Sequence, residues 1–319
     1  MKQKILLLET LAEEAMEILL ADNSYEVILA FNEEVLQAAI EEGNIQAIIT
    51  RGKGQVRANL MDQIPSLQLI ARAGVGLDNI DVDEASKRKI KVVNAPNSNA
   101  NTIAEHTISL ILNLQRNMYT AFSMVKEGRW KDRGNYVGDE VHGKTLGILG
   151  MGNIGKKVAK IAEALGMKVC YWSAFKEDVP YPMLSLQEVL NNSDIISLHL
   201  PLTSETENMI NSEALAQMKK GALLINTARG KIIDQKALNE ALESGKLGGF
   251  AADVLAVEPP EADEPLIKHP NTLITAHVGS LTKTTYTQMC TMTVENTLAI
   301  LNGKEASPNC IFNRKALGI

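Results

Sequence analysis

Three side chains with acid, base or anion-binding chemistry follow short apolar runs in the second half of the chain: Arg229, Glu258 and His277. A guanidinium binds a carboxylate through two parallel hydrogen bonds. Histidine is the usual general acid or base near neutral pH. A carboxylate such as Glu258 on its second ring nitrogen would hold the tautomer and favour the protonated form.

Each of these residues on its own also fits a structural role. Arg229 fits a surface residue that caps a loop, Glu258 a solvated loop residue, and His277 a hydrogen-bonded structural histidine. Taken together they match what the reduction of a 2-keto acid requires, namely an anion clamp and a proton donor to the carbonyl oxygen. The remaining requirement is a source of hydride.

A glycine motif near the middle of the chain, Gly150-Met-Gly-Asn-Ile-Gly155, predicts that source. It follows the apolar run Thr145–Leu149 and opens the helical pattern Lys156–Leu165. Strand, glycine turn and helix form the context in which this motif binds a dinucleotide. The first glycine permits the tight turn, the second lets the pyrophosphate approach, and the third packs helix on strand. The N-terminus of the helix then faces the phosphates, so we expect a nicotinamide cofactor here.

Short apolar runs alternate with helical patterns along almost the whole chain. This alternation predicts parallel sheets with helices on both faces, arranged as two α/β units in tandem. The predicted strands lie at 4–8, 26–30, 46–50, 67–71 and 90–93, and then at 145–149, 168–172, 194–198, 222–225, 248–252 and 272–275.

Two long helical patterns determine the predicted domain boundaries. Asn99–Glu127 contains no proline or glycine and is expected to be one helix that connects the two units. Thr284–Leu301 is followed by a short polar tail, which is too small for a domain and should return to the first unit. We therefore predict a discontinuous unit of residues 1–98 and 288–319 around a dinucleotide-binding unit of residues 99–287.

Composition excludes several functional classes. The net charge of −6 over 319 residues argues against a nucleic-acid surface. No apolar run approaches the roughly 18 residues needed to span a membrane, and the N-terminal apolar run, with a lysine before it and a glutamate after it, reads as a strand, not a signal peptide. The three cysteines are widely spaced without a C-x-x-C pattern, so neither disulfides nor a metal site are indicated. A cytoplasmic location is expected.

The order of motifs resembles the D-isomer-specific 2-hydroxyacid dehydrogenase family over nearly the whole chain. The matching segments are Arg72–Asp81, Asn94–Asn97, Ala104–His106, Gly147–Gly155, Leu198–Thr203, Asn226–Gly230, Asp253–Val254, Val257–Pro259 and His277–Ser280. The resemblance implies an NAD(P)-dependent oxidoreductase acting on the CH–OH group of a D-2-hydroxy acid. It also implies two doubly wound parallel-sheet domains, a Rossmann cofactor domain inserted into a flavodoxin-like substrate domain.

The resemblance also implies the roles of individual residues. Arg229 would bind the substrate carboxylate and keto oxygen, His277 would be the acid/base, and Glu258 would orient it. Backbone N–H groups of Val75 and Gly76 would hold the substrate carboxylate. The implied cofactor-binding residues are Gly150, Gly152, Asn153, Ile154, Gly155, Ser173, His199, Pro201, Thr206, Thr227, Ala228 and Asp253, the last at the nicotinamide carboxamide.

Two positions depart from the family pattern. The second strand of a dinucleotide fold normally ends in an acid that binds the ribose hydroxyls, and Ser173 stands there. Without that acid, Ser173 and Lys176 could accept a 2′-phosphate, so NADP or dual use is favoured over NAD alone, while nearby Glu177 opposes it. Ala276 replaces the usual proline before the histidine, so a less rigid loop is expected there.

Two arginines at neighbouring predicted strand ends, Arg51 and Arg72, could together bind a phosphate. Both match arginines that 3-phosphoglycerate dehydrogenases place around their substrate, although each could be a solvent-facing residue at the rim. The favoured activity is therefore 3-phosphoglycerate dehydrogenase-like, without the C-terminal regulatory domain. Glyoxylate/hydroxypyruvate reductase and D-lactate-type activities are the alternatives.

A more distant alternative is a cofactor-sensing binding protein like the corepressors that resemble this family. The complete set of Arg229, Glu258 and His277 favours catalysis over that role. Trp130 follows the long helical pattern in the region through which the family forms two-fold dimers, although a packing role is also open. A homodimer is expected.

Overall fold

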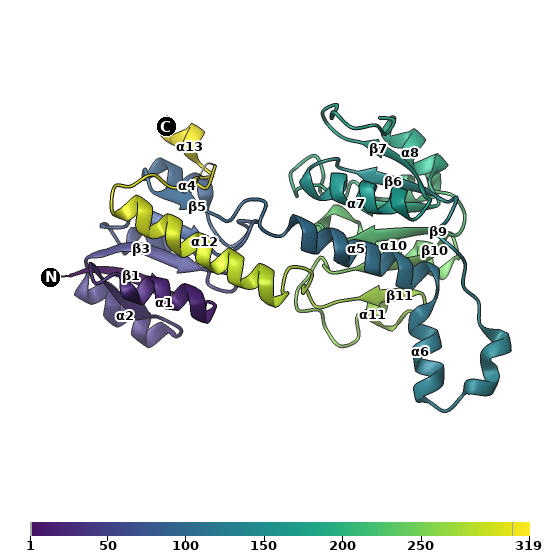
Figure 1. Cartoon of the computed structure of the whole chain (residues 1–319), viewed down its shortest axis with the longest axis horizontal. Helices are drawn as coiled ribbons and strands as arrows, with labels where there is room; N and C mark the ends of the chain where they lie inside the picture. The colour runs from purple at the N-terminus through teal and green to yellow at the C-terminus, as the bar shows by residue number, and fades with distance from the viewer. Residues whose placement is uncertain (1, 308) are drawn as a thin grey trace. The chain divides into compact units, whose positions relative to one another are not determined.

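The computed structural model describes residues 2–307 and 309–319. The chain divides into two compact units (Figure 1). Unit 1 comprises Met1–Asn99 and Leu281–Ile319, and unit 2 comprises Ala100–Ser280. Unit 2 ends at Ser280 and not at the predicted residue 287, because the whole helix Lys283–Leu301 belongs to unit 1.

Unit 1 contains a five-stranded parallel sheet in the order β2-β1-β3-β4-β5. This is the flavodoxin-like order, and the five strands predicted from apolar runs are confirmed. Their bounds are β1 (Gln3–Leu7), β2 (Tyr25–Leu29), β3 (Ile45–Thr50), β4 (Leu69–Arg72) and β5 (Lys91–Val93).

Helices cover both faces of the unit 1 sheet, as the apolar faces of a buried parallel sheet require. One face packs against α1 (Glu13–Ala21) and α12 (Lys283–Leu301), through residues such as Leu19 and Val294. The other face is covered by α2 (Glu33–Glu42), α3 (Ala58–Asp62) and α4 (Val82–Lys87). After α12 the chain returns to β5, where the N–H of Phe312 donates to the carbonyl of Val92, and ends in α13 (Arg314–Leu317).

Unit 2 contains a six-stranded parallel sheet in the order β11-β10-β9-β8-β6-β7. Beyond β7, Met183 makes a single parallel bridge to Tyr171. With that bridge counted as a reduced third strand, the order is that of the Rossmann fold. The six strands predicted from apolar runs in this unit are confirmed. They are β6 (Thr145–Leu149), β7 (Lys168–Trp172), β8 (Ile195–Leu198), β9 (Ala222–Asn226), β10 (Leu247–Ala252) and β11 (Thr272–Ile274).

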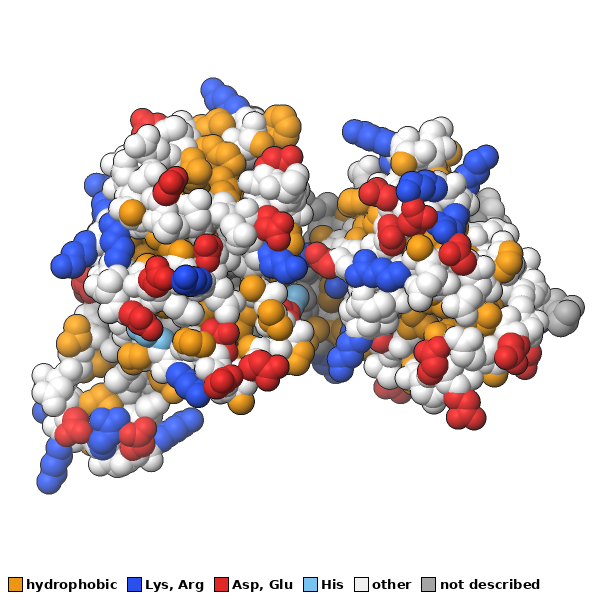
Figure 2. All heavy atoms as spheres, turned by 180° about the vertical axis from the view of Figure 1, so that it is seen from behind, with side chains coloured by type: hydrophobic (Ala, Val, Ile, Leu, Met, Phe, Trp, Pro, Cys, Tyr) orange, Lys and Arg blue, Asp and Glu red, His pale blue; other side chains and the backbone are white. Residues whose placement is uncertain are grey.

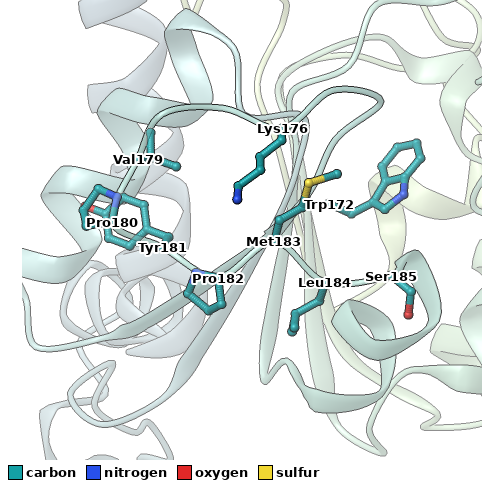
Figure 3. Close-up of a pocket in the computed structure, with 9 residues that line it drawn as sticks. All are labelled: Trp172, Lys176, Val179, Pro180, Tyr181, Pro182, Met183, Leu184 and Ser185. Carbon is teal, nitrogen blue, oxygen red and sulfur yellow. The ribbon is translucent and has the colours of Figure 1, made fainter.

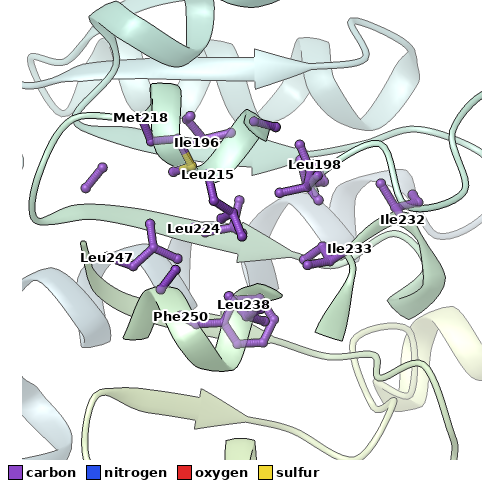
Figure 4. Close-up of a cluster of buried hydrophobic side chains, with 14 of the residues drawn as sticks. Ile196, Leu198, Leu215, Met218, Leu224, Ile232, Ile233, Leu238, Leu247 and Phe250 are labelled. Carbon is purple, nitrogen blue, oxygen red and sulfur yellow. The ribbon is translucent and has the colours of Figure 1, made fainter. Parts of the chain in front are cut away.

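Two buried clusters fill the faces of the unit 2 sheet. On one face α9 (Ser212–Gln217) and α10 (Gln235–Glu243) pack on the central strands through Leu215, Leu238 and Phe250 (Figure 4). The other face packs against α5 (Ala100–Gln115) and α7 (Asn153–Ala164). The remaining helices are α6 (Met118–Lys126), η1 (Trp130–Asn135), α8 (Leu186–Asn192), η2 (Gly230–Ile232) and α11 (Pro265–Lys268).

The strands of unit 2 end at one edge of the sheet. Their last residues pair in register: Trp172 with Leu149, Leu149 with Leu198, Leu198 with Asn226, Asn226 with Ala252, and Ala252 with Ile274. Every loop that follows carries residues singled out by sequence. Open parallel sheets bind ligands at this edge, at the point where strand order reverses, which here lies between β6 and β8.

The prediction of one continuous helix over Asn99–Glu127 is wrong. The segment forms α5 and α6 (Met118–Lys126), which are separated at Asn117. Asn117 has φ of 48°, a left-handed conformation that asparagine tolerates better than most residues, and its side-chain amide donates to the carbonyl of Val137 at 3.0 Å. The break turns α6 and the following η1 away from the sheet of unit 2 (Figure 1).

The surface carries charges of both signs. On the face drawn in Figure 2, basic and acidic side chains are interspersed over each unit. Among the described residues, no helix combines the length and apolar character needed to cross a bilayer.

Candidate active site

His277 and Glu258 form a close pair on loops that follow neighbouring strands of unit 2. Nδ1 of His277 lies 2.6 Å from Oε2 of Glu258. The hydrogen bond that His277 donates to Glu258 is the main reason that the pKa of His277 lies above its ordinary value. Burial alone would raise the pKa of Glu258, but the bonds from His277 and from the Leu255 N–H hold it below its usual range. The imidazolium–carboxylate form of the pair is therefore favoured.

The backbone at His277 is strained and held in place by Asp253. His277 has φ of 52°, which is uncommon for a residue with a side chain. Its N–H donates to the carbonyl of Asp253 at 3.0 Å, and the next two N–H groups, of Val278 and Gly279, donate to the Asp253 carboxylate at 2.9 and 2.8 Å. These bonds fix the turn, which was expected to be less rigid because Ala276 stands where the family usually has proline. Such strain persists where surrounding contacts over-determine the conformation.

Asp253 has further partners that the sequence did not reveal. Its Oδ1 accepts from the Thr275 hydroxyl at 2.6 Å and lies 3.5 Å from Nε2 of His106, which also contacts Thr275 at 3.0 Å. Burial would raise the pKa of Asp253, but these bonds and those from Val278 and Gly279 lower it. The carboxylate, 2% exposed, thus positions the His277 turn. Its predicted contact with the nicotinamide carboxamide stays a prediction.

Arg229 lies directly after β9 on the loop next to that of Glu258. Asn226, the last residue of β9, shapes this loop, because its side chain donates to the Arg229 carbonyl at 2.9 Å and accepts from the Ala228 N–H at 3.0 Å. The guanidinium donates to the Ala228 carbonyl at 2.7 Å. The positive charge of Arg229 opposes the rise in the pKa of His277, which places the two groups within electrostatic reach.

The glycine motif has the geometry that a dinucleotide pyrophosphate requires. Gly150 has φ of 99°, and a Cβ there would lie 2.4 Å from the carbonyl oxygen of His199. A Cβ on Gly155 would lie 2.2 Å from the Gly150 carbonyl, whereas one on Gly152 would meet no atom within 4 Å. Gly152 caps α7, so Asn153 and Ile154 are its first residues. The loop is closed where helix meets strand and open where the phosphates would approach, so these residues fit the group.

The other predicted cofactor residues lie around the same edge. His199 Nε2 contacts the Ser197 hydroxyl at 2.9 Å, and burial lowers the pKa of His199 to about 4, so its ring is neutral. The Thr206 hydroxyl donates to the Pro201 carbonyl at 2.6 Å. The Thr227 hydroxyl lies 2.9 Å from that of Thr107 on α5. These contacts hold the side chains that border the edge of the sheet where its strands end.

An open pocket of about 800 Å³ lies beside Ser173, at the end of β7. Trp172 and Ser185 lie on one side of it, and Lys176 points into the space enclosed by the labelled residues (Figure 3). The other residues that line it are Val179, Pro180, Tyr181, Pro182, Met183 and Leu184. The reduced third strand, which pairs only at Met183, forms one wall.

The predicted substrate residues Arg51, Arg72, Val75 and Gly76 all belong to unit 1. The last residues of β3 and β4, Thr50 and Arg72, are register partners. Nη2 of Arg72 lies 4.0 Å from the point that a Cβ on Gly52 would occupy, so its guanidinium lies beside the loop that carries Arg51. The Val75 carbonyl accepts from the Asn94 side chain at 2.7 Å.

Glu9 and Tyr286 hold Arg51, and neither residue was predicted to do so. Oε1 of Glu9 accepts from the N–H groups of Arg51, Gly52 and Gly54 at 2.9, 2.7 and 2.9 Å. Burial would raise the pKa of Glu9, but these backbone bonds lower it. Arg51 donates from Nη1 to the Tyr286 hydroxyl at 3.0 Å, and its guanidinium carbon lies 5.3 Å from the ring centre. The arginine is thus fixed at the edge of its sheet.

Comparison with known proteins agrees with this site. Residues 108–279 match the model of the D-isomer specific 2-hydroxyacid dehydrogenase NAD binding domain. The chain is 43% identical to a D-3-phosphoglycerate dehydrogenase of Bacillus subtilis over 79% of its length, and spans 49% of that relative. It is 39% identical to a glyoxylate reductase of Korarchaeum cryptofilum, with 80% of the chain and 79% of the relative covered.

A solved structure of a Thermus thermophilus protein superposes with a TM-score of 0.88 at 37% identity, covering 95% of this chain and 98% of the other. The matched domain includes the glycine motif, Arg229, Glu258 and His277. The chain belongs to the D-isomer specific 2-hydroxyacid dehydrogenase family.

Proposed function

We propose that the protein transfers hydride between a nicotinamide cofactor and a D-2-hydroxy acid or the matching 2-keto acid. The observation that carries this proposal is the His277–Glu258 pair, with Nδ1 and Oε2 2.6 Å apart, on the same sheet edge as Arg229 and the glycine motif. The nicotinamide supplies the hydride when bound. The chain's own residues bind the acid, orient it and move one proton.

In the direction of reduction, the Arg229 guanidinium binds the keto acid's carboxylate and polarises its carbonyl oxygen. The Nδ1 atom of His277 is engaged by Glu258, so Nε2 is the ring atom that donates a proton to that oxygen. Glu258 stabilises the protonated ring before transfer and keeps its orientation after it. Oxidation of the hydroxy acid reverses the proton step, with neutral His277 as the base.

The cofactor is proposed to lie along the edge from the glycine motif to the pocket beside Ser173. The N–H groups at the start of α7 would bind the pyrophosphate. The pocket, with Trp172 and Met183 among its walls, offers apolar surface of the kind that accepts an adenine ring. Ser173 lies at the end of β7, next to Trp172, where the adenosine ribose would be bound.

The substrate proposed first is a phosphorylated acid, 3-phosphoglycerate or phosphohydroxypyruvate. Two guanidiniums at adjacent strand ends, Arg51 and Arg72, suit a dianionic phosphate. Arg51 is held in place by Glu9 and Tyr286 and its side chain is 32% exposed, so it is both ordered and accessible. The B. subtilis relative carries that activity in its name. Glyoxylate or hydroxypyruvate, suggested by the K. cryptofilum relative, and D-lactate are the alternatives.

Replacing Arg51 by alanine tests the substrate. We expect kcat/KM for phosphohydroxypyruvate to fall by about 10- to 100-fold, the worth of a hydrogen bond to a charged group, while kcat/KM for hydroxypyruvate stays within about threefold. Arg57→Ala is the matched control, because Arg57 contacts Gln55 and the Asp78 carbonyl in the same unit. Equal losses on both substrates, or none on either, would count against the phosphate assignment while leaving hydride transfer untouched.

A homodimer is proposed through the segment that leaves the unit 2 sheet at Asn117. It exposes large apolar side chains: Tyr119 (60%), Phe122 (56%), Val125 (55%), Trp130 (65%) and Val137 (77%). Clusters of this kind on a projecting segment are typical of protein interfaces. Light scattering at micromolar concentration is expected to give twice the chain mass of 34.8 kDa. A monomer under those conditions would contradict the proposal.

We also propose that the protein works in the reducing cytoplasm. Cys170, Cys290 and Cys310 are free and buried. Burial raises the pKa of each thiol, which keeps all three protonated and unreactive.

A further inference from the structure

The acid missing at Ser173 has a structural substitute four residues later. Oε2 of Glu177 lies 2.7 Å from Nζ of Lys156. Lys156 follows Gly155 directly and lies in the first turn of α7. The ion pair therefore ties the loop after β7 to the helix that begins at the glycine motif.

The backbone of this loop is anchored at the same residue. The N–H of Glu177 donates to the hydroxyl of Tyr171 at 3.2 Å, and that hydroxyl lies 3.4 Å from the Glu177 carbonyl. Tyr171 is 1% exposed and belongs to β7. The backbone of Glu177 is thus held by its two hydrogen bonds with the Tyr171 hydroxyl. Its side chain is held by Lys156 and is still 32% exposed to solvent.

Resting on the proposed nicotinamide function, we propose that Glu177, held by Lys156, selects NAD over NADP. The Glu177 carboxylate lies between the loop after β7 and the first turn of α7. Since the adenosine ribose is proposed to bind at the end of β7, a 2′-phosphate on that ribose would approach this carboxylate. It repels that dianion and leaves an uncharged ribose unaffected. Lys156 is already paired with Glu177. Lys176, which lines the pocket beside Ser173, is the other cation near a 2′-phosphate, and the Glu177 carboxylate is proposed to outweigh it. This assignment reverses the preference for NADP or dual use that Ser173 alone suggests.

Binding of cofactor, without any substrate, tests the proposal. The dissociation constants of NADH and NADPH are measured by energy transfer from the protein's tryptophans, and those of NAD and NADP by calorimetry. Wild-type protein is expected to bind NADH at least about tenfold more tightly than NADPH, the scale of one unit-charge repulsion at a partly exposed site. Failure to bind either cofactor would count against the proposed function itself, whereas equal binding of both would overturn only the role of Glu177.

Glu177→Gln keeps the size of the side chain and removes its charge. We expect it to narrow the NADH preference by about tenfold, mainly through tighter NADPH binding. Asp178→Asn is the matched control, since it removes one negative charge at the next residue, and it should alter the ratio by less than about twofold. An unchanged ratio in Glu177→Gln, or an equal shift in Asp178→Asn, would overturn the assignment.

Discussion

Replacing His277 by asparagine should lower kcat for keto-acid reduction by about 10²-fold or more, the scale of general acid catalysis. Asparagine fits the left-handed backbone at this position better than most residues, so the turn held by Asp253 should survive. KM should change little, because the carboxylate of the substrate is assigned to Arg229. Steady-state kinetics with saturating reduced cofactor measure both constants. Undiminished kcat in a folded variant would remove His277 from the mechanism.

The pH dependence gives the same assignment a second readout. Reduction needs protonated His277, so its rate should be full at low pH and fall as pH rises through the raised pKa of this histidine. Oxidation needs the neutral ring, so its rate should rise as pH rises through the same pKa. Because the hydrogen bond to Glu258 is the largest cause of the raised pKa of His277, Glu258→Gln should move both limbs to lower pH. Identical limbs in wild type and variant would show that the pair does not set this titration.

Replacing Arg229 by alanine should lower kcat/KM by about 10²–10³-fold, comparable to the loss of one preorganised donor in an active site. Arg229→Lys restores the charge but lacks the planar fork that matches a carboxylate, so it should recover only part of the loss. Lys231→Ala removes an exposed cation two residues further along and serves as the control. Activity in Arg229→Ala equal to that of Lys231→Ala would contradict the clamp.

Arg229 should also affect the pH dependence of the rate, which a purely structural role would not explain. Its charge opposes the rise in the pKa of His277. Residual activity of Arg229→Ala should therefore show its reductive limb at higher pH than wild type, opposite to the shift expected for Glu258→Gln. A shift in the same direction as Glu258→Gln would place the guanidinium outside the electrostatic reach of the histidine.

The strands and the sheet order were predictable because parallel strands that are buried on both faces read as short apolar runs. The helix over Asn99–Glu127 was not, because its break at Asn117 depends on a bond to Val137, twenty residues away, and not on a local proline or glycine. The reduced third strand of unit 2 was also not predicted. It makes only one bridge, at Met183, and has no apolar run that would mark it as a strand.

The candidate catalytic residues could be proposed from sequence because each lies in the loop that follows a strand, and strand ends converge at one edge. Their supporting residues were not. His106 reaches Asp253 from α5, and Glu9 and Tyr286 reach Arg51 from the two ends of the chain. Only the motif Ala104–His106 gave a signal for one of them, without a role. The sequence already placed Glu177 against a 2′-phosphate, but its contact with Lys156 was not predictable, because it joins the loop after β7 to the helix that follows the glycine motif.

The proposed activity is hydride transfer to a 2-keto acid to give a 2-hydroxy acid of D configuration. The most direct test incubates the protein with a reduced nicotinamide cofactor and hydroxypyruvate, follows the loss of cofactor absorbance, and resolves the enantiomers of the product. We expect oxidation of the cofactor that requires His277 and yields D-glycerate alone. Cofactor binding without turnover of any 2-keto acid, as expected of a cofactor-sensing protein, or formation of L-glycerate, would contradict it.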